Sequence, residues 1–232
     1  MNNKKIKVIA FDADDTLWIN ETYFREKEKS FLEIMSSYID SPIQIMDELY
    51  KTEIMNLSIF GYGAKGFTLS MIETAVKITD SEITPDDLMK LVDLGKSLLT
   101  IPIEILDDVE KVLSCLQDKY KLVVATKGDL LDQERKLAKS GLNKYFHHIE
   151  IMSDKKEVNY HKLLEKLDIK PDQFLMIGNS LKSDIVPVVN IGGNALFIPF
   201  HTTWIHESIE EKNIKHLNYI KVDKIIDVLQ YL

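Results

Sequence analysis

Three carboxylates follow a short apolar run near the start of the chain. Residues 8–11 read Val-Ile-Ala-Phe, which is typical of a buried strand, and Asp12, Asp14 and Asp15 come directly after it. Ligands of open α/β sheets bind just beyond the carboxyl ends of such strands. Carboxylates this close repel one another unless a cation or a proton joins them. We therefore expect Asp12 to lie at the centre of a magnesium-assisted phosphoryl site, since Mg²⁺ takes carboxylate, carbonyl and phosphate oxygens as ligands.

The spacing of these carboxylates sets a condition on the backbone. Asp12 and Asp14 alternate, so an extended chain would point them to opposite faces. Either the chain turns here, or one of the two binds its ligand through a main-chain carbonyl. A simpler alternative is that Asp14 or Asp15 only caps the helix that follows.

Polar clusters also follow three later apolar runs. The runs are 122–125, 148–152 and 174–177, and the clusters contain Thr126 and Lys127, Lys155 and Lys156, and Asn179 and Asp184. Any one of these residues alone could be a helix cap or a solvated surface charge. Because the carboxyl ends of parallel strands meet at one edge of a sheet, their common placement predicts a single site.

Phosphoryl transfer needs a nucleophile, an acid for the leaving group, donors for the phosphate oxygens and a cation. Asp12 is the candidate nucleophile, which would pass through an aspartyl phosphate, and Asp14 is the candidate general acid and base. The other candidates are Thr126, Lys127 and either Lys155 or Lys156 for the phosphate, and Asp12, Asp14, Asn179 and Asp184 for Mg²⁺.

Strand and helix patterns alternate from about residue 104 onwards, which indicates βαβ units and a parallel sheet. The expected strands are 6–11, 122–125, 148–152, 174–177 and 195–198, with a weak strand near Tyr219 and a last helix at about 222–231. Residues 20–100 show only helical patterns, with Ser41-Pro42 and Thr84-Pro85 as helix starts. We predict an α/β protein with a three-layer, doubly wound core of at least five parallel strands, formed by 1–17 and 101–232, and an all-helical domain at 18–100.

A glycine-rich loop interrupts the helical block. Gly61, Gly63 and Gly66 lie close together around Lys65, in a stretch with three aromatic residues, Phe60, Tyr62 and Phe67. The order of Gly, Lys and Ser or Thr does not fit a phosphate-binding P-loop, and a plain flexible connection is one explanation. We expect Gly63, Lys65 and Phe67 to contact the leaving group of the substrate.

The composition indicates a globular protein. The chain has 232 residues, 45% of them apolar, and a net charge of −8, which argues against general nucleic-acid binding and requires any phosphate site to carry local positive charge. The lone Cys115 has no internal disulfide partner, and its apolar neighbours predict that it is buried.

No stretch approaches the roughly 18 apolar residues of a membrane-spanning helix. We expect a cytoplasmic monomer or homodimer that binds a small phosphorylated metabolite, and neither nucleic acid nor a membrane.

Four motifs of this chain resemble those of the haloacid dehalogenase (HAD) superfamily, phosphatase branch. The first motif, Asp-x-Asp-x-Thr, is met by residues 12–16, and the second, a Thr that ends a core strand, by Thr126. The third, a Lys before a helix, is met by Lys155 or Lys156, and the spacing to Tyr160 favours Lys155. The fourth, related to Gly-Asp-x-x-x-x-Asp, is met by residues 178–184, and the helical block at 18–100 is similar to that superfamily's cap domain.

The resemblance implies a HAD-like core with a five-stranded parallel sheet, magnesium dependence and an aspartyl-phosphate route. It implies that the main-chain carbonyl of Asp14 ligates the metal. An acid at this position favours phosphate monoesters, since dehalogenating members lack an acid there and phosphonate-cleaving members have a small residue. Asn179 departs from the pattern, because many members have Asp; Asn keeps an oxygen acceptor but removes one negative charge.

We therefore expect a magnesium-dependent phosphatase of small phosphate monoesters. Two alternatives stay open. A phosphotransferase or mutase would pass the phosphate to an alcohol or sugar acceptor, and a non-catalytic regulatory protein would bind metal or phosphate without turnover. The second alternative is supported only by Asn179.

Overall fold

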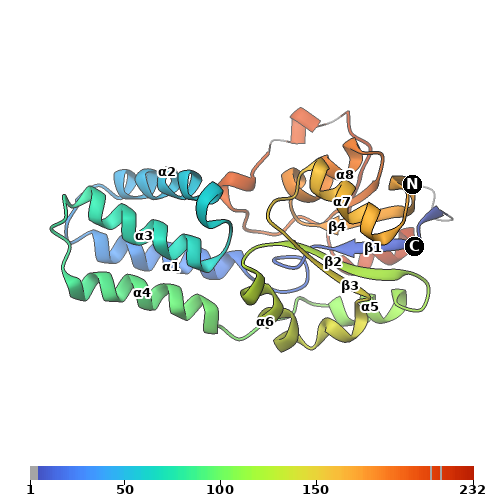
Figure 1. Cartoon of the computed structure of the whole chain (residues 1–232), viewed down its shortest axis with the longest axis horizontal. Coiled ribbons are helices and arrows are strands. Elements are labelled where there is room, and N and C mark those ends of the chain that lie inside the picture. Colours follow the sequence, from blue (N-terminus) through green and yellow to red (C-terminus); the bar gives the residue numbers. More distant parts are fainter. Residues whose placement is uncertain (1–4, 210, 215) are drawn as a thin grey trace. The chain divides into compact units, whose positions relative to one another are not determined.

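The fold is described by a computed structural model that covers residues 5–209, 211–214 and 216–232. The strands are β1 (Val8–Phe11), β2 (Lys121–Lys127), β3 (His148–Met152), β4 (Phe174–Gly178), β5 (Asn194–Phe197) and β6 (Ile220–Lys221) (Figure 1). The α-helices are α1 (Glu21–Met35), α2 (Pro42–Phe60), α3 (Ala64–Ile78), α4 (Pro85–Thr100), α5 (Val109–Leu116), α6 (Leu130–Ser140), α7 (Glu157–Leu167) and α8 (Val186–Asn190).

The sheet contains six strands in the order β3-β2-β1-β4-β5-β6, and all neighbours pair in parallel. β1 is central: Phe11 pairs with Val124 of β2 on one side and with Ile177 of β4 on the other. β2 and β3 lie on one side of β1, and β4, β5 and β6 lie on the other. The carboxyl end of β1 is therefore a topological switch point, where ligands bind in this class of fold. The predicted α/β class with a doubly wound parallel sheet is confirmed.

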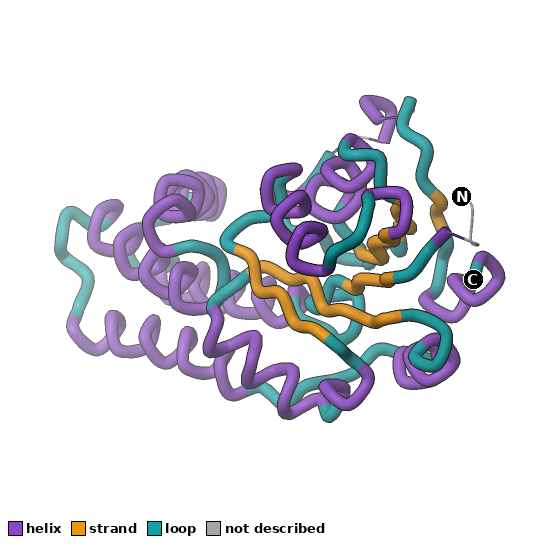
Figure 2. Tube along the Cα trace, turned by 45° about the vertical axis from the view of Figure 1, so that its right-hand side comes forward, coloured by secondary structure: helices purple, strands orange, loops and turns teal. Residues whose placement is uncertain are grey.

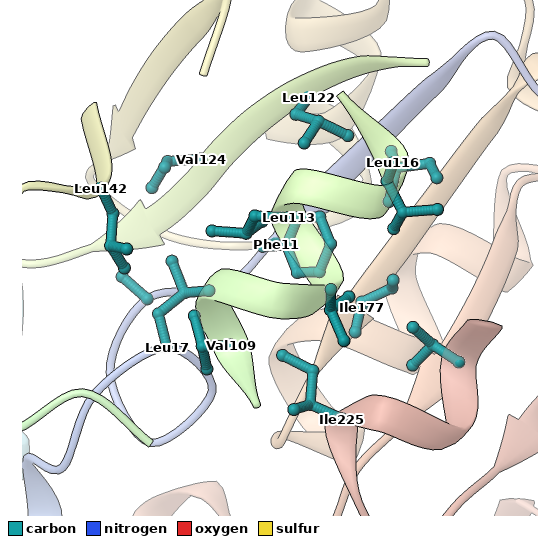
Figure 3. Close-up of a cluster of buried hydrophobic side chains, with 14 of the residues drawn as sticks. Phe11, Leu17, Val109, Leu113, Leu116, Leu122, Val124, Leu142, Ile177 and Ile225 are labelled. Carbon is teal, nitrogen blue, oxygen red and sulfur yellow. The ribbon is translucent and has the colours of Figure 1, made fainter. Parts of the chain in front are cut away.

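Each face of the sheet is covered by its own layer of helices (Figure 2). On one face, Phe11, Val124 and Ile177 pack against Val109 and Leu113 of α5, as Figure 3 shows. The other face carries the alternate residues of the same strands and packs against α7 and α8. Both faces are buried, which explains why the strands read as continuous apolar runs instead of alternating ones.

The chain divides into two compact units. The sheet unit contains Met1–Glu21, Ile103–Lys127 and Gln133–Leu232, and the helical unit contains Thr22–Pro102 and Gly128–Asp132. Each unit has a hydrophobic core of its own.

The helical unit is built from α1, α2, α3 and α4, and the starts of α2 and α4 follow the sequence signals. The Ser41 side chain accepts from the main-chain N–H of Gln44, and Thr84 accepts from Asp87, each followed by a proline in the first turn. α3 and α4 approach each other closely at Gly95, where a Cβ would lie 1.9 Å from Thr68 Oγ1.

One expectation about the sheet unit is wrong, and another is confirmed with a different helix type. Cys115 is exposed, because the apolar stripe of α5 consists of Val109, Val112, Leu113 and Leu116 and leaves Cys115 on the outer side. The C-terminal segment Ile225–Tyr231 is helical as expected, but it forms a 3₁₀-helix. Among the described residues, no helix is long and apolar enough to cross a membrane.

Candidate active site

The candidate residues of the sheet unit lie beyond the carboxyl ends of adjacent strands. Asp12 follows β1, and its main-chain N–H donates to Ile177 O of β4 at 2.9 Å. Thr126 lies at the end of β2 and is buried, and Asp184 lies in a short π-helix, Leu181–Ile185, after β4 and is fully buried. Because β1 lies between β2 and β4, the first motif lies between the second and the fourth motifs.

Lys155 joins two of these carboxylates. Its ammonium donates to Asp12 Oδ1 and, at 2.6 Å, to Asp184 Oδ1, and its side chain is only 1% exposed. Lys156, by contrast, has an exposed side chain that pairs with Asp154 at 2.8 Å. Of the two candidate lysines, the structure brings Lys155 into the cluster and leaves Lys156 outside it.

Burial and this cation act in opposite directions on the protonation of the cluster. Burial raises the pKa of Asp12 to about 7, although the neighbouring Lys155 opposes the rise. Burial alone would lower the pKa of Lys155, but the carboxylates of Asp12 and Asp184 outweigh it and raise that pKa above its usual range. Lys155 is therefore a permanent positive charge beside the candidate nucleophile.

Gly178 is required by the packing of Asp184. A Cβ at Gly178 would lie 2.3 Å from Asp184 Oδ2, so no larger residue fits while Asp184 keeps its position. The same Oδ2 accepts from the main-chain N–H of Ser180 at 2.9 Å. The fourth motif thus folds back on itself and holds the Asp184 carboxylate towards Lys155.

The side-chain amide of Asn179 lies beside Asp12 and the main chain of Asp14. Its side-chain amide lies 3.2 Å from Asp12 Oδ2 and 3.3 Å from the main-chain oxygen of Asp14. With its nitrogen on this side, the amide donates to both oxygens. In the opposite orientation, the amide oxygen of Asn179 accepts from Thr16 Oγ1 at 3.3 Å. That oxygen then faces Asp12 Oδ2 and the main-chain oxygen of Asp14, and none of these three oxygens can donate to another.

This donor set fits a hard divalent ion, which prefers carboxylate, carbonyl and amide oxygens. Among the described residues, no three side chains of His, Cys, Asp or Glu are placed to share a metal. The ligand set proposed from the sequence does not consist only of such side chains. Asp14 would contribute its main-chain oxygen, and Asn179 an amide oxygen.

The side-chain carboxylate of Asp14 accepts hydrogen bonds from three donors. Trp18 Nε1 donates to Asp14 Oδ1 at 2.7 Å, Lys136 Nζ donates to the same oxygen at 2.9 Å, and Gln133 Nε2 donates to Oδ2 at 2.7 Å. Gln133 and Lys136 were not among the residues singled out in the sequence. Their only signal is a spacing of three residues on one helix, which places them on the same side of α6.

Asp15 is a helix cap, as the simpler alternative for this motif supposed. Its carboxylate accepts from the main-chain N–H groups of Asn20 and Glu21, at 2.8 Å and 3.0 Å, at the start of α1. Asp15 has a φ of 61°, so the chain turns directly after Asp14. Burial raises the pKa of Asp15 to about 8, opposed by the N–H of Asn20.

Lys127 has a carboxylate partner that the sequence did not suggest. Its ammonium lies 2.5 Å from Glu207 Oε1 and 2.9 Å from Ser183 Oγ, and Glu207 also accepts from Ser180 Oγ at 2.6 Å. Burial would raise the pKa of Glu207, but Lys127 and the two hydroxyls outweigh it and lower the pKa. Glu207 thus connects Ser180 of the fourth motif with Lys127 at the end of β2, and its carboxylate pairs with the ammonium of Lys127.

Gly63 and Lys65 lie in the helical unit. Lys65 Nζ forms an ion pair with Asp129 at 2.9 Å within that unit, and Gly63 has a φ of 109°, which favours glycine. A role of Gly63 and Lys65 in substrate binding stays a prediction.

The raised pKa values predict how the stability of the metal-free protein depends on pH. Asp12 and Asp15 bind more protons in the folded than in the unfolded chain between pH 4 and their folded pKa values of about 7 and 8. Their contribution to stability is therefore present at low pH and is lost as the pH rises through 7 and 8. We expect the Tm in EDTA, measured by differential scanning fluorimetry, to fall between pH 5 and pH 9. Asp15→Asn should flatten this dependence, and a Tm that rises over the range would contradict the assignment.

The comparisons with known proteins agree on one family. The family model described as hydrolase, haloacid dehalogenase-like hydrolase, matches residues 6–192. A crystal structure of a haloacid dehalogenase-like family hydrolase from Xanthomonas campestris is 40% identical, covers 88% of this chain and 86% of its own, and has a TM-score of 0.82.

Two curated relatives are more distant but match over nearly their whole length. Both are glyceraldehyde 3-phosphate phosphatases. The one from Methanothermobacter thermautotrophicus is 24% identical over 90% of this chain and 92% of its own. The one from Pyrococcus furiosus is 24% identical over 98% of this chain and 94% of its own.

Proposed function

Because the chain belongs to the haloacid dehalogenase-like hydrolase family, we propose that it hydrolyses phosphate monoesters of small metabolites through an aspartyl phosphate, with Mg²⁺ as cofactor. The observation that carries this proposal is the buried group of Asp12, Lys155 and Asp184 at the switch point of the sheet. The carboxylate of Asp12 and the fixed cation of Lys155 are two of the parts that phosphoryl transfer to an aspartate needs, and Asp184 is proposed as a metal ligand beside them.

The first step transfers the phosphoryl group to the protein. Asp12 attacks phosphorus with a carboxylate oxygen, the bond between phosphorus and the leaving oxygen breaks, and that oxygen takes a proton from Asp14. Lys155 holds the Asp12 side chain and offsets charge that develops on the phosphate oxygens. We propose that Thr126, at the end of β2, donates its hydroxyl to the phosphate instead of to the main-chain oxygen of Lys127, which accepts it at 3.2 Å in the free protein.

The second step releases phosphate. Asp14, now ionised, takes a proton from a water molecule, the water oxygen attacks phosphorus, and the bond to Asp12 breaks. This restores Asp12 as a carboxylate and Asp14 as an acid, so protons and charges balance over the cycle.

The proposed metal ligands are Asp12, the main-chain oxygen of Asp14, Asn179 and Asp184. The oxygens around Asn179 support the first three, and the burial of Asp184 beside them supports the fourth. Bound Mg²⁺ would supply positive charge to the phosphate oxygens. Asn179 would make the ligand set one charge less negative than a set with Asp, so we propose weaker binding of the ion than in relatives with Asp.

The substrate is proposed as a small phosphorylated metabolite, and the relatives that are glyceraldehyde 3-phosphate phosphatases make a phosphorylated triose the first candidate. Thr126 and Lys155 are proposed to bind its phosphate. Lys127 was predicted to bind phosphate as well, and such a role would have to compete with Glu207 for its ammonium. Gly63 and Lys65 are proposed to contact the leaving group.

The proposal is tested by measuring phosphate release from a panel of phosphorylated trioses, sugars and polyols, with Mg²⁺ and with EDTA. We expect release on part of the panel, with a loss of at least about a hundredfold in EDTA. Transfer of phosphate to an added alcohol or sugar instead of water would favour the phosphotransferase alternative. Binding of Mg²⁺ or phosphate with no turnover on any ester would favour a regulatory protein.

A further inference from the structure

We propose that Trp18, Gln133 and Lys136 are positioning residues that hold Asp14 for acid–base work and leave one defined oxygen, Oδ2, to exchange the proton. This inference rests on the proposed function. It concerns residues that none of the four motifs contains, and its evidence is the set of contacts around the Asp14 carboxylate.

The two oxygens of Asp14 are not equivalent. Oδ1 receives two donors, the indole of Trp18 and the ammonium of Lys136, at 2.7 Å and 2.9 Å. Oδ2 receives one, the amide of Gln133 at 2.7 Å. A carboxylate oxygen has two lone pairs in its plane, so Oδ1 is filled while Oδ2 keeps one lone pair for a proton. The leaving oxygen in the first step and the water in the second would therefore meet Oδ2.

Each donor is itself held by further contacts. Lys136 Nζ also donates to Asn20 Oδ1 at 2.7 Å, and Gln133 Nε2 also donates to the main-chain oxygen of Lys127 at 3.0 Å. Trp18 is buried, and its main chain bridges to Asp14 and Ile105. The carboxylate is thus fixed by groups that cannot easily turn away, which is how a site keeps its reacting atom in place.

The oxygen of the Gln133 amide shows that this orientation has a cost. Gln133 is buried, and its Oε1 has no hydrogen-bond partner within the described part of the chain. Leaving a buried acceptor unsatisfied is unfavourable. The amide keeps both N–H groups on Asp14 and Lys127 O, which connects the proposed acid to the strand end that carries Thr126.

A purely structural reading is that Lys136 and Gln133 only fasten α6 to the turn after β1. The two readings differ in their dependence on the leaving group. An aryl phosphate such as p-nitrophenyl phosphate releases an acidic phenol and needs little protonation, whereas glycerol 3-phosphate releases an alkoxide that needs a proton. A misplaced acid therefore slows the alkyl ester selectively, while a distorted fold slows both esters alike.

The experiment compares kcat/KM for these two esters in Lys136→Met, Gln133→Leu and the matched control Lys139→Met, an exposed lysine one turn further along α6. We expect the first two variants to lose about 10²-fold on glycerol 3-phosphate and less than about tenfold on p-nitrophenyl phosphate. Lys139→Met should match the wild type on both esters. Equal losses on the two esters would overturn the proposal.

A second readout does not depend on activity. The indole N–H of Trp18 donates to Asp14 Oδ1, so its ¹H–¹⁵N signal reports on that carboxylate, and the indole signal of Trp204 serves as reference. We expect the Trp18 signal to shift in Lys136→Met and Gln133→Leu and not in Lys139→Met. An unchanged Trp18 signal in the first two variants would also overturn the proposal. A wild type inactive on every ester would overturn the proposed function instead, and the Trp18 signal would still show whether these residues hold Asp14.

Discussion

Asp12→Asn is expected to abolish turnover, with a loss in kcat of about 10⁴-fold or more, because an amide cannot form the aspartyl phosphate. The fold should stay intact. Asp12 lies buried with a pKa raised to about 7, so replacing it with a neutral side chain of the same shape removes a charge that burial disfavours. We expect the Tm of this variant at pH 8 to equal or exceed that of the wild type.

Two further measurements make the role of Asp12 specific. Acid quenching during turnover should leave phosphate covalently attached to the wild type and none attached to Asp12→Asn. Asp15→Asn is the matched control. It makes the same chemical change three residues away, at a side chain that caps α1. That variant should keep its activity within about tenfold. Normal turnover by Asp12→Asn would remove Asp12 as the nucleophile.

The fold and the family were predictable because their signals are local. Each core strand is a short apolar run whose two faces are both buried, and each run ends in polar residues that can be read directly from the chain. The family prediction is confirmed by the model match over residues 6–192. The order of the strands in the sheet, by contrast, is known only from the structure.

The partners of the motif residues were not predictable from local pattern. Lys127 was expected at the phosphate, yet it pairs with Glu207, which is 80 residues further along the chain. Gln133 and Lys136 reach Asp14 across more than a hundred residues. A single sequence shows which side chains can form a charged hydrogen bond, but only the packed fold decides which of them meet.

For Asp15, local chemistry suggested the right role but did not show which residue fills it. A carboxylate near the start of a helix can accept from its first main-chain N–H groups, and Asp15 does so for α1 from six residues before Glu21. Asp14, one residue earlier, has the same side chain but points to α6, because the chain turns between the two. Residue type alone could not separate these outcomes.

Lys155→Met should produce the second large effect, on both activity and stability. The substitution keeps most of the buried apolar stem and removes the cation shared by Asp12 and Asp184. Breaking a buried pair in this way costs about 3–5 kcal/mol, because a charge is left without its partner. We expect a loss of at least about 10³-fold in kcat/KM and a lower Tm in EDTA at pH 8.

The matched control is Lys156→Met, which removes an exposed lysine that pairs only with Asp154 among the contacts described above. Surface pairs of this kind contribute about 0–1 kcal/mol, so the Tm and activity should change little. Loss of activity in Lys156→Met with retention in Lys155→Met would reverse the assignment of the third motif.

The pH dependence of the Lys155→Met variant separates electrostatic from packing effects. Without Lys155, the repulsion between Asp12 and Asp184 is relieved when either carboxylate takes a proton. The Tm difference between the variant and the wild type should therefore narrow as the pH falls from 8 to 5, and added Mg²⁺ should narrow it at pH 8. A difference that is constant across this range would mean that Lys155 acts through its packing, because a packing defect does not respond to protonation.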